Sequence, residues 1–265
     1  MPKRVESPSS INTFFQCNRK YYYQYIEKLP TKGSIHLVRG NIAHSTLEHF
    51  YDLDVSSFTN YEKDFKVAIQ KLFLEQWDEY KEELFALQLP QKELAGYFEE
   101  TLIMLMNWCN FFLKDFKEKF SEGIEETFTK IKPITEAEYS SDTLSVRGFI
   151  DAIRSEGEEV HIIDYKTNAN SDIKDSIKLQ LGIYSLLYQE KHGKTPDKVG
   201  VFFLKDKLYL LPVDQPFLQR AKVAISSIHA HTSTCEKKEE YKKNITPLCK
   251  WRTGQCDFYG VCKPF

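Results

Sequence analysis

The sequence lacks the long apolar runs that membrane-spanning helices need. Across its 265 residues there is no uncharged apolar stretch of about 18 residues, the usual minimum for such a helix. The first residues, Met-Pro-Lys-Arg-Val-Glu, are followed by no apolar run, so no secretory signal peptide is predicted. We therefore expect a soluble, cytoplasmic protein that makes no contact with a membrane.

Glycine and proline are scarce, at 11 and 10 residues, which excludes collagen-like and low-complexity chains. Hydrophobic residues make up 42% of the chain and aromatic residues 14%, which is enough to build a large core. No internal repeat and no Ser/Gly-rich linker divides the sequence. We therefore expect a single domain over residues 1–265.

A strong excess of one charge is also missing, since 36 Lys and Arg stand against 38 Asp and Glu. Although the total charge is nearly balanced, the charges are distributed unevenly along the chain. Residues 1–33 carry six basic and two acidic side chains, and residues 231–265 carry seven basic and four acidic ones. Both ends of the chain are therefore basic and the part between them is acidic.

Hydrophobic spacing predicts helices first, then three strands, a helix, two strands and a final helix. This order indicates an α/β fold with a mixed central β-sheet flanked by helices, an N-terminal helical region and a Cys-rich C-terminal tail. We expect N-terminal helices in 1–50, a helical insertion in 51–130, an α/β core in 131–230 and the tail in 231–265. The expected helices are 7–28, one beginning near 39–40, 61–87, 93–120, 172–191 and 216–230, and the expected strands are 136–140, 144–154, 160–166, 199–204 and 208–211.

Two aspartates fall within the expected strands. Asp164 and Lys166 share one face at the end of a buried strand, where charges are costly to desolvate. Asp151 lies in the apolar strand before it, and antiparallel pairing would bring it close to Asp164. Two acids and a lysine suit a divalent cation that activates a water molecule. The residues alone leave a strand-end salt bridge as the alternative.

These segments resemble the PD-(D/E)xK nuclease superfamily. The resemblance rests on Gly148-Phe-Ile-Asp151, Asp164-Tyr-Lys166 and Gln180-Leu-Gly-Ile-Tyr184, with His44 as the early histidine of the pattern. It is closest to the RecB and AddB exonuclease domains and to the CRISPR-associated adaptation nucleases. The segment from Ser10 to Tyr22, which includes Cys17 and Arg19, is similar to their first helix. The resemblance implies a restriction-endonuclease-like core.

The resemblance also implies roles for single residues. Mg²⁺ or Mn²⁺ would be bound by side chains and one backbone carbonyl, and a lysine would orient or help deprotonate the attacking water. The implied metal ligands are His44, Asp151, Asp164 and the carbonyl of Tyr165; Lys166 is the implied catalytic lysine, and Gln180, Tyr184 and Arg19 are the implied substrate-binding residues. Glu136 and Glu138 are candidates for an outer layer around the ligands, without an assigned role.

Six cysteines are present, and three of them fall in the last part of the chain. Without a secretory signal we expect them to be reduced, so clustered cysteines indicate metal binding. In relatives with a cysteine in the first helix, three C-terminal cysteines complete a [4Fe–4S] cluster. The implied ligands here are Cys17, Cys249, Cys256 and Cys262. The spacing between Cys249 and Cys256 is longer than usual, which leaves Cys235 as a substitute, and zinc remains the alternative cofactor.

The function implied by the resemblance is metal-dependent exonuclease activity on single-stranded DNA ends, in DNA repair and recombination or in CRISPR adaptation. Its partners would be helicases or CRISPR adaptation proteins. The alternative is a non-catalytic iron–sulfur or zinc DNA-binding subunit of a helicase–nuclease complex, and the residues do not separate DNA from RNA. A cluster would join the two basic ends into one DNA-binding surface. Its basic members would be Arg19, Lys20, Lys250 and Arg252, with Phe15, Tyr21, Trp251, Phe258 and Tyr259 as stacking faces.

Overall fold

The computed structural model describes residues 4–168, 171–252 and 254–264. Its five-stranded sheet has the order β1-β2-β3-β4-β5, in which only β3 and β4 are parallel. The sheet is therefore mixed, as predicted. Its strands are β1 (Ile134–Ser141), β2 (Val146–Glu156), β3 (Glu159–Lys166), β4 (Lys198–Phe203) and β5 (Leu208–Pro212).

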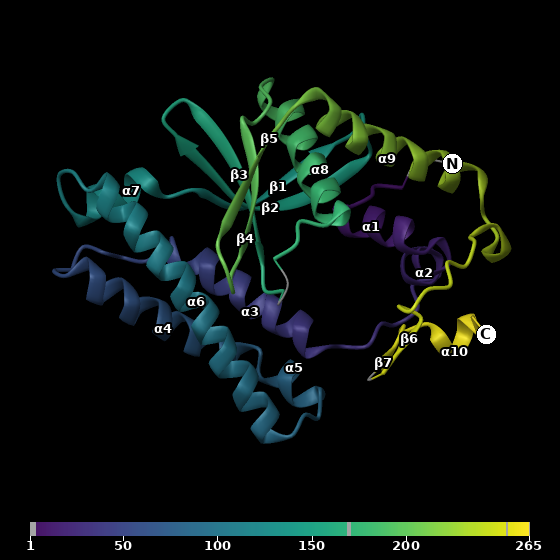
Figure 1. Ribbon diagram of the computed structural model, residues 1–265, viewed down its shortest axis with the longest axis horizontal. Coiled ribbons are helices and arrows are strands. Elements are labelled where there is room, and N and C mark those ends of the chain that lie inside the picture. Colours follow the sequence, from purple (N-terminus) through teal and green to yellow (C-terminus); the bar gives the residue numbers. More distant parts are fainter. Residues whose placement is uncertain (1–3, 169–170, 253, 265) are drawn as a thin grey trace.

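Helices cover both faces of the sheet (Figure 1). On one face pack α3 (Ile35–Phe50), α4 (Tyr61–Glu79), α5 (Lys81–Ala86), α6 (Gln91–Lys119) and α7 (Ile124–Ile131). On the other face pack α1 (Pro8–Gln16), α8 (Asp175–His192) and α9 (Gln215–Thr234). The period-2 alternation of strand side chains explains the two cores: Ile162 of β3 packs in one core and Ile163 in the other.

The crossover between the two parallel strands determines where α8 lies. A parallel pair cannot be joined by a hairpin, and here α8 connects β3 to β4 across one face of the sheet. The following Gly193 adopts a left-handed φ of 68° and ends the helix as predicted. The crossover therefore places the first turns of α8 beside the end of β3, which carries Asp164 and Lys166.

The expected continuous helix 7–28 is interrupted. Ser7 caps α1 and exchanges hydrogen bonds with Ser10, but Cys17 is extended, with φ −165° and ψ 113°. The chain resumes as α2 (Asn18–Tyr21) and a π-helical turn, η1 (Tyr22–Ile26). An extended residue cannot continue the helical hydrogen-bond ladder, so the break at Cys17 redirects the chain.

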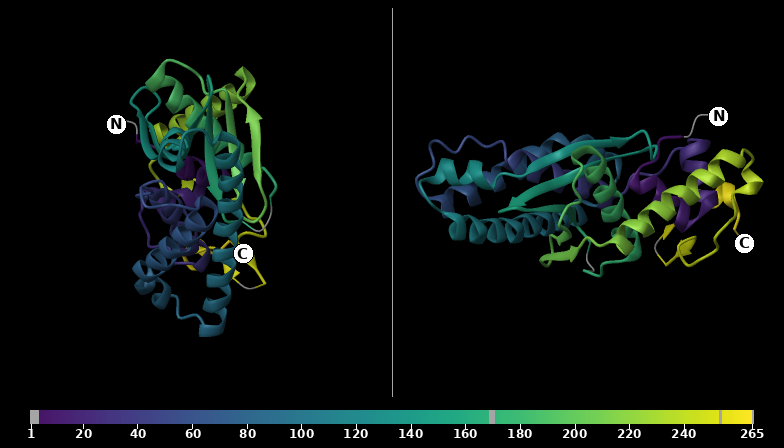
Figure 2. Two further views of the ribbon diagram at one scale, coloured as in Figure 1. Left: turned by 90° about the vertical axis from the view of Figure 1, so that its left-hand side faces the viewer. Right: turned by 90° about the horizontal axis from the view of Figure 1, so that it is seen from above.

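The C-terminal tail lies beside α2 (Figure 1), at the opposite end of the molecule from α7 (Figure 2, right). It contains a short turn η2 (Lys238–Glu240), a two-stranded ladder of β6 (Lys250–Trp251) and β7 (Gly254–Gln255), and α10 (Tyr259–Cys262). Asn244 donates its side-chain amide to the carbonyl oxygen of Gln16 at 2.8 Å. The two basic ends of the chain are therefore neighbours in space.

Two further details differ from the sequence predictions. The expected helix 61–87 is divided at Tyr80 into α4 and α5, and α7 lies where no helix was predicted. The β6–β7 ladder and α10 were not predicted either. Among the residues that the structure describes, none of the helices combines the length and the apolar character of a membrane span.

Candidate active site

The candidate site forms where β2 and β3 separate. Their antiparallel register runs from Glu156 opposite Glu159 to Ala152 opposite Ile163. Asp151 and Asp164 come next on the two strands, just beyond the last regular pair. The short turn fixes this register, and both carboxylates are buried.

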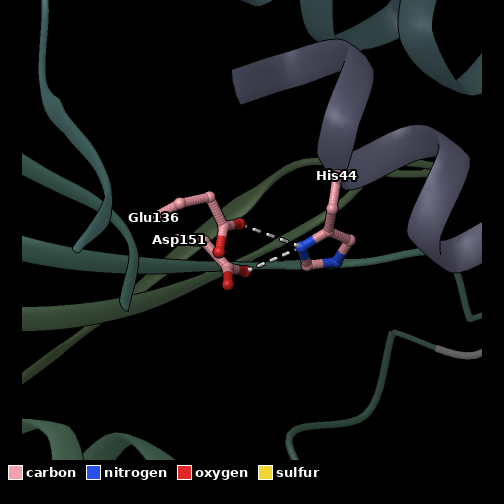
Figure 3. A group of neighbouring side chains, drawn as sticks. All are labelled: His44, Glu136 and Asp151. Atoms are coloured by element: carbon pink, nitrogen blue, oxygen red, sulfur yellow. Dashed lines mark ion pairs between the residues drawn. The ribbon is translucent and has the colours of Figure 1, made fainter. Parts of the chain in front are cut away.

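The helix α3 brings His44 to the same place (Figure 3). Its Nδ1 atom lies 3.4 Å from the Oδ2 atom of Asp151 and 3.8 Å from the Oε1 atom of Glu136. Its Nε2 atom lies 3.0 Å from the carbonyl oxygen of Tyr165. His44 therefore contacts an aspartate of β2, a glutamate of β1 and the backbone of β3.

Glu136 is the residue to which sequence reasoning assigned no role. In the β1–β2 register Thr135 pairs with Ala152 and Ala137 pairs with Ile150, so Glu136 stands opposite Asp151. Its φ of 43° is left-handed, which is uncommon for a residue with a side chain and costs free energy. The available signal was the strand register, because counting back from the β1–β2 turn pairs position 136 with position 151.

A second group of contacts joins β3 to α8. The Nζ atom of Lys166 lies 2.7 Å from the Oδ2 atom of Asp164. The side-chain amide of Gln180 donates to the Oδ1 atom of Asp164 at 2.9 Å, and it also lies 2.9 Å from the hydroxyl oxygen of Tyr184. The four side chains therefore form one connected network.

Tyr184 does not have the exposure that contact with a base requires. Its ring is only 5% exposed and lies in the core between the sheet and α8. A Cβ atom at Gly148 would lie 3.1 Å from this ring, so the glycine of the Gly148-Phe-Ile-Asp151 segment lets β2 approach it. In this structure Tyr184 orients Gln180, and no face of its ring is free for stacking.

The carboxylates of the site stabilise the positively charged forms of His44 and Lys166. Burial is the largest single effect on His44 and would lower its pKa, but the charges of Asp151 and Asp164 and the hydrogen bonds to Asp151 and Glu136 together outweigh it and raise the pKa to about 10. Burial raises the pKa of Asp164 to about 6, against the opposing charge of Lys166. The cations His44⁺ and Lys166⁺ therefore balance a buried group of carboxylates.

The donor atoms fit a divalent metal ion. One ligand atom each from His44, Glu136 and Asp151 lie within 4.8 Å of one another. Carboxylate and carbonyl oxygens with one imidazole suit Mg²⁺ or Mn²⁺. Asp164 stands outside this group, because its two oxygens face Lys166 and Gln180. The arrangement thus brings together His44, Asp151 and the carbonyl of Tyr165 as the sequence predicted, and it adds Glu136.

The four cysteines expected to bind a cluster line one cavity of about 270 Å³ between α2 and the tail. The backbone N–H of Asn244 points to the Sγ atom of Cys17 at 3.4 Å, and the Sγ atom of Cys249 lies 3.7 Å from the carbonyl oxygen of Asn244. Cys235 is not among the residues that line this cavity, and Cys109 is buried in α6. The cavity walls therefore include Cys17, Cys249, Cys256 and Cys262.

The expected aromatic surface of the two chain ends is only partly present. Tyr21 and Phe258 are buried and cannot offer a ring face to a base, which corrects that expectation. Phe15 and Trp251 are about half exposed. The guanidinium Nε of Arg19 donates to the carbonyl oxygen of Tyr241 at 2.8 Å, so this arginine also holds the tail against α2.

Comparison with known proteins identifies the fold. The model of the PD-(D/E)XK nuclease superfamily matches residues 6–263. The chain is similar to a crystal structure named as a putative exonuclease from Eubacterium rectale, with a TM-score of 0.53 and 12% identity over 100% of this chain and 94% of that one. It is also similar to the structure of SSO0001, with a TM-score of 0.35 and 15% identity over 86% of this chain and 97% of that one.

No curated protein sequence matches the chain. At 12% identity the likeness to the first structure shows the shared fold. The superfamily match, in contrast, covers nearly the whole sequence and includes the segments that carry His44, Asp151, Asp164 and Lys166. The chain belongs to the PD-(D/E)XK nuclease superfamily.

Proposed function

We propose that this protein is a metal-dependent nuclease that hydrolyses phosphodiester bonds at single-stranded DNA ends. The observation that carries the proposal is the meeting of two groups at the end of β3. One is the His44, Glu136 and Asp151 group, and the other is the network of Asp164 and Lys166 with α8. Family membership alone would not exclude a site that has lost its activity, but here Asp151 and Asp164 remain buried and are paired with His44 and Lys166.

In this proposal His44, Asp151 and the carbonyl of Tyr165 hold Mg²⁺ or Mn²⁺, with Glu136 or Asp164 completing the oxygen ligands. The ion supplies Lewis-acid chemistry, since it polarises phosphate oxygens and lowers the pKa of water. A single imidazole among hard oxygen donors is a donor set that these ions accept. The carboxylates of Asp151 and Glu136 lie 3.4 and 3.8 Å from the Nδ1 atom of His44 and supply the negative charge that such an ion needs.

Lys166 then positions the attacking water. Its Nζ atom is held 2.7 Å from Asp164. Burial would lower the pKa of this lysine, but the charges of Asp164 and Asp151 and the hydrogen bond to Asp164 together outweigh burial and raise it. Lys166 therefore stays protonated and donates hydrogen bonds to water or to a phosphate oxygen. Gln180 keeps Asp164 in place by donating to its other oxygen.

We also propose that the cysteine-lined cavity holds a [4Fe–4S] cluster. Four thiolates are a suitable ligand set for either this cluster or zinc. Four sulfur atoms about 2.3 Å from one zinc ion would lie about 3.8 Å apart. Among the residues described, no three cysteines place their sulfur atoms within 4.8 Å of one another. A cavity of about 270 Å³ lined by all four cysteines has room for the larger group, and this supports the cluster.

One assay tests the catalytic proposal. End-labelled single- and double-stranded DNA and RNA are incubated with the full chain and Mg²⁺, Mn²⁺ or EDTA, with Asp151→Asn as the control. We expect single-stranded DNA to be shortened from its ends with either metal, and no cleavage with EDTA or by the variant. Binding of DNA without cleavage in either metal would instead favour a non-catalytic DNA-binding subunit.

A further inference from the structure

One face of the β1–β2 hairpin is open beside the metal group. Ala137 and Tyr139 of β1 and Ile150 of β2 pack into the core beneath α8. Because side chains alternate along a strand, the residues between them point to the opposite face. Glu138 and Phe149 lie on that face, directly opposite each other in the register.

Phe149 is unusually placed for an aromatic residue. Its side chain is 52% exposed although its neighbours in the strand, Gly148 and Ile150, are buried. It stands two residues before Asp151 on the same face, which corresponds to roughly 6.6 Å along the strand. The ring is therefore about one nucleotide away from the atoms that would hold the metal ion.

The charged side chains around Phe149 determine which part of a nucleic acid can contact its ring. Glu138 stands opposite and is exposed, so its carboxylate repels a phosphate group at that position. Arg147 follows on the same face, two residues farther from Asp151, opposite Ser140. It is exposed and offers a fork of donors that suits a phosphate. A nucleic-acid strand that crosses this face away from Asp151 would thus contact the ring of Phe149 first and the guanidinium group of Arg147 next.

We propose that Phe149 is a stacking platform for the base next to the scissile phosphate, and that Arg147 binds the phosphate that follows. This inference rests on the proposed nuclease function and names the substrate form that the site takes. A base can lie on the ring only when it is not paired in a duplex, so the platform selects single-stranded ends. The open face of the hairpin is the path along which the strand reaches His44 and Asp151.

The inference predicts a measurable loss of binding. Removing a stacked aromatic ring weakens single-strand binding roughly 5- to 150-fold per base. We expect this loss for Phe149→Ala and Phe149→Leu, because leucine keeps apolar bulk without the ring. Phe149→Trp should bind at least as tightly as the wild type. Arg147→Ala should reduce the dependence of binding on salt, since it removes one phosphate contact.

A matched control lies in the helical part of the chain. Phe85 is 71% exposed and lies on the short helix α5, outside the sheet. Phe85→Ala removes an exposed phenylalanine ring without touching the sheet, so binding and cleavage should stay as in the wild type. Circular dichroism and the visible spectrum of each variant show whether the fold is retained.

The experiment measures anisotropy of a fluorescein-labelled oligothymidylate in the Asp151→Asn background, so that the strand is not cut. The same strand with one abasic nucleotide near its end is the second probe. We expect the parent protein to bind the abasic strand more weakly than the intact strand. Phe149→Ala should bind the two strands equally well. In the corresponding proteins that keep Asp151 and can cleave DNA, the loss should appear as a higher KM, with kcat changed much less.

The results separate this inference from the function on which it rests. If Phe149→Ala and Phe149→Leu bind single strands within about twofold of the parent protein, as we expect for Phe85→Ala, Phe149 is not a stacking platform. That conclusion holds even if the wild type cleaves DNA. If the wild type cleaves no substrate but binding still depends on Phe149, the nuclease proposal fails and the platform stands.

Discussion

The carboxylate of Asp151 accepts a hydrogen bond of 2.7 Å from the backbone N–H of Tyr165. This bond replaces the regular ladder between β2 and β3 at the point where that ladder ends. The same carboxylate faces His44 and supplies negative charge to the proposed metal site. Asp151 therefore holds the backbone of β3 and, in the proposed site, would also bind the metal ion; these two roles can be separated by substitution.

Asp151→Asn and Asp151→Ala should differ in stability but not in activity. Asparagine keeps an oxygen that accepts from Tyr165, whereas alanine leaves this buried N–H without a partner, at a cost of about 1–3 kcal/mol. Both lose the carboxylate charge that the metal ion needs. We expect no cleavage by either variant, and urea denaturation should show that only the alanine variant is clearly less stable. Cleavage by Asp151→Asn above about a hundredth of the wild-type rate would contradict the proposed role.

Lys166→Ala should abolish cleavage without removing the metal ion. The ammonium group contacts Asp164 and not the His44 group, so its loss should leave Mn²⁺ affinity within a few-fold of the wild type. We expect a rate at least about 100-fold lower, a typical size for the loss of a positioned acid–base group. Metal titration and single-turnover cleavage measure the two effects separately. Lys178→Ala, on the neighbouring helix α8, is the control, and a similar loss there would contradict a specific role for Lys166.

Part of this site could be read from the sequence because short-range rules determine it. The hairpin between β2 and β3 has a tight turn, so counting from the turn places Asp151 beside Asp164. The Asp164 and Lys166 pair follows from strand alternation. The expectation of a mixed α/β fold is confirmed for the same reason, since the periods of strands and helices are local properties.

Other features depend on tertiary structure, and the sequence could not reveal them. The strand register places Glu136 opposite Asp151, but no local pattern indicates its left-handed backbone conformation or its contact with His44. The burial of Tyr184 follows from the close approach of Gly148, which only packing decides. The break at Cys17 lies inside a run with helical spacing, where the tail packs against α2. Tertiary contacts override local propensity at each of these positions.

Mn²⁺ affinity should increase with pH. Burial would lower the pKa of His44, but in the metal-free protein the combined effect of Asp151, Glu136 and Asp164 outweighs burial and raises it to about 10. His44 is therefore protonated below that value and must release a proton before it can bind a metal ion. We expect the affinity to rise with pH up to about 10 and to fall further below about 6, where the buried Asp164 takes up a proton.

Isothermal titration with Mn²⁺ in buffers of different ionisation enthalpy measures the released proton directly. His44→Ala should bind Mn²⁺ more weakly and release about one proton fewer between pH 7 and 9, because the titrating ligand is gone. His49→Ala is the control, since His49 lies on the same helix and is absent from the His44, Glu136 and Asp151 group. Equal proton release by His44→Ala and the wild type would exclude His44 as a ligand.

The purified protein should be brown and contain iron and acid-labile sulfide, as expected for an iron–sulfur cluster. Cys256→Ser and Cys262→Ser should lose the colour, because both residues line the cavity with Cys17 and Cys249. Cys235→Ser and Cys109→Ser should keep it, since neither residue lines that cavity. If the protein instead contains stoichiometric zinc and no acid-labile sulfide, the cavity holds a zinc site and not an iron–sulfur cluster.

The tail should contribute to DNA binding through its cations. Lys250 and Arg252 lie on or next to β6, Trp251 between them is half exposed, and the Nζ atom of Lys250 lies over the ring of Tyr259 at 5.8 Å. Because the tail packs beside α2, these charges join those of Lys20 and Arg19 at one end of the molecule. A negatively charged strand would be attracted to this end and repelled by the acidic remainder.

The double substitution Lys250→Ala/Arg252→Ala tests this surface. If both side chains contact phosphates, the slope of log affinity against log salt should fall by about 1.4, or 0.7 for each single-strand contact. Lys71→Ala/Lys81→Ala removes two exposed charges from α4 and α5 and should leave the slope unchanged. A double variant that stays brown and folded but keeps the wild-type slope would show that the tail lies outside the binding surface. Loss of the cluster should lower affinity and stability together, because the cluster would join the tail to α2.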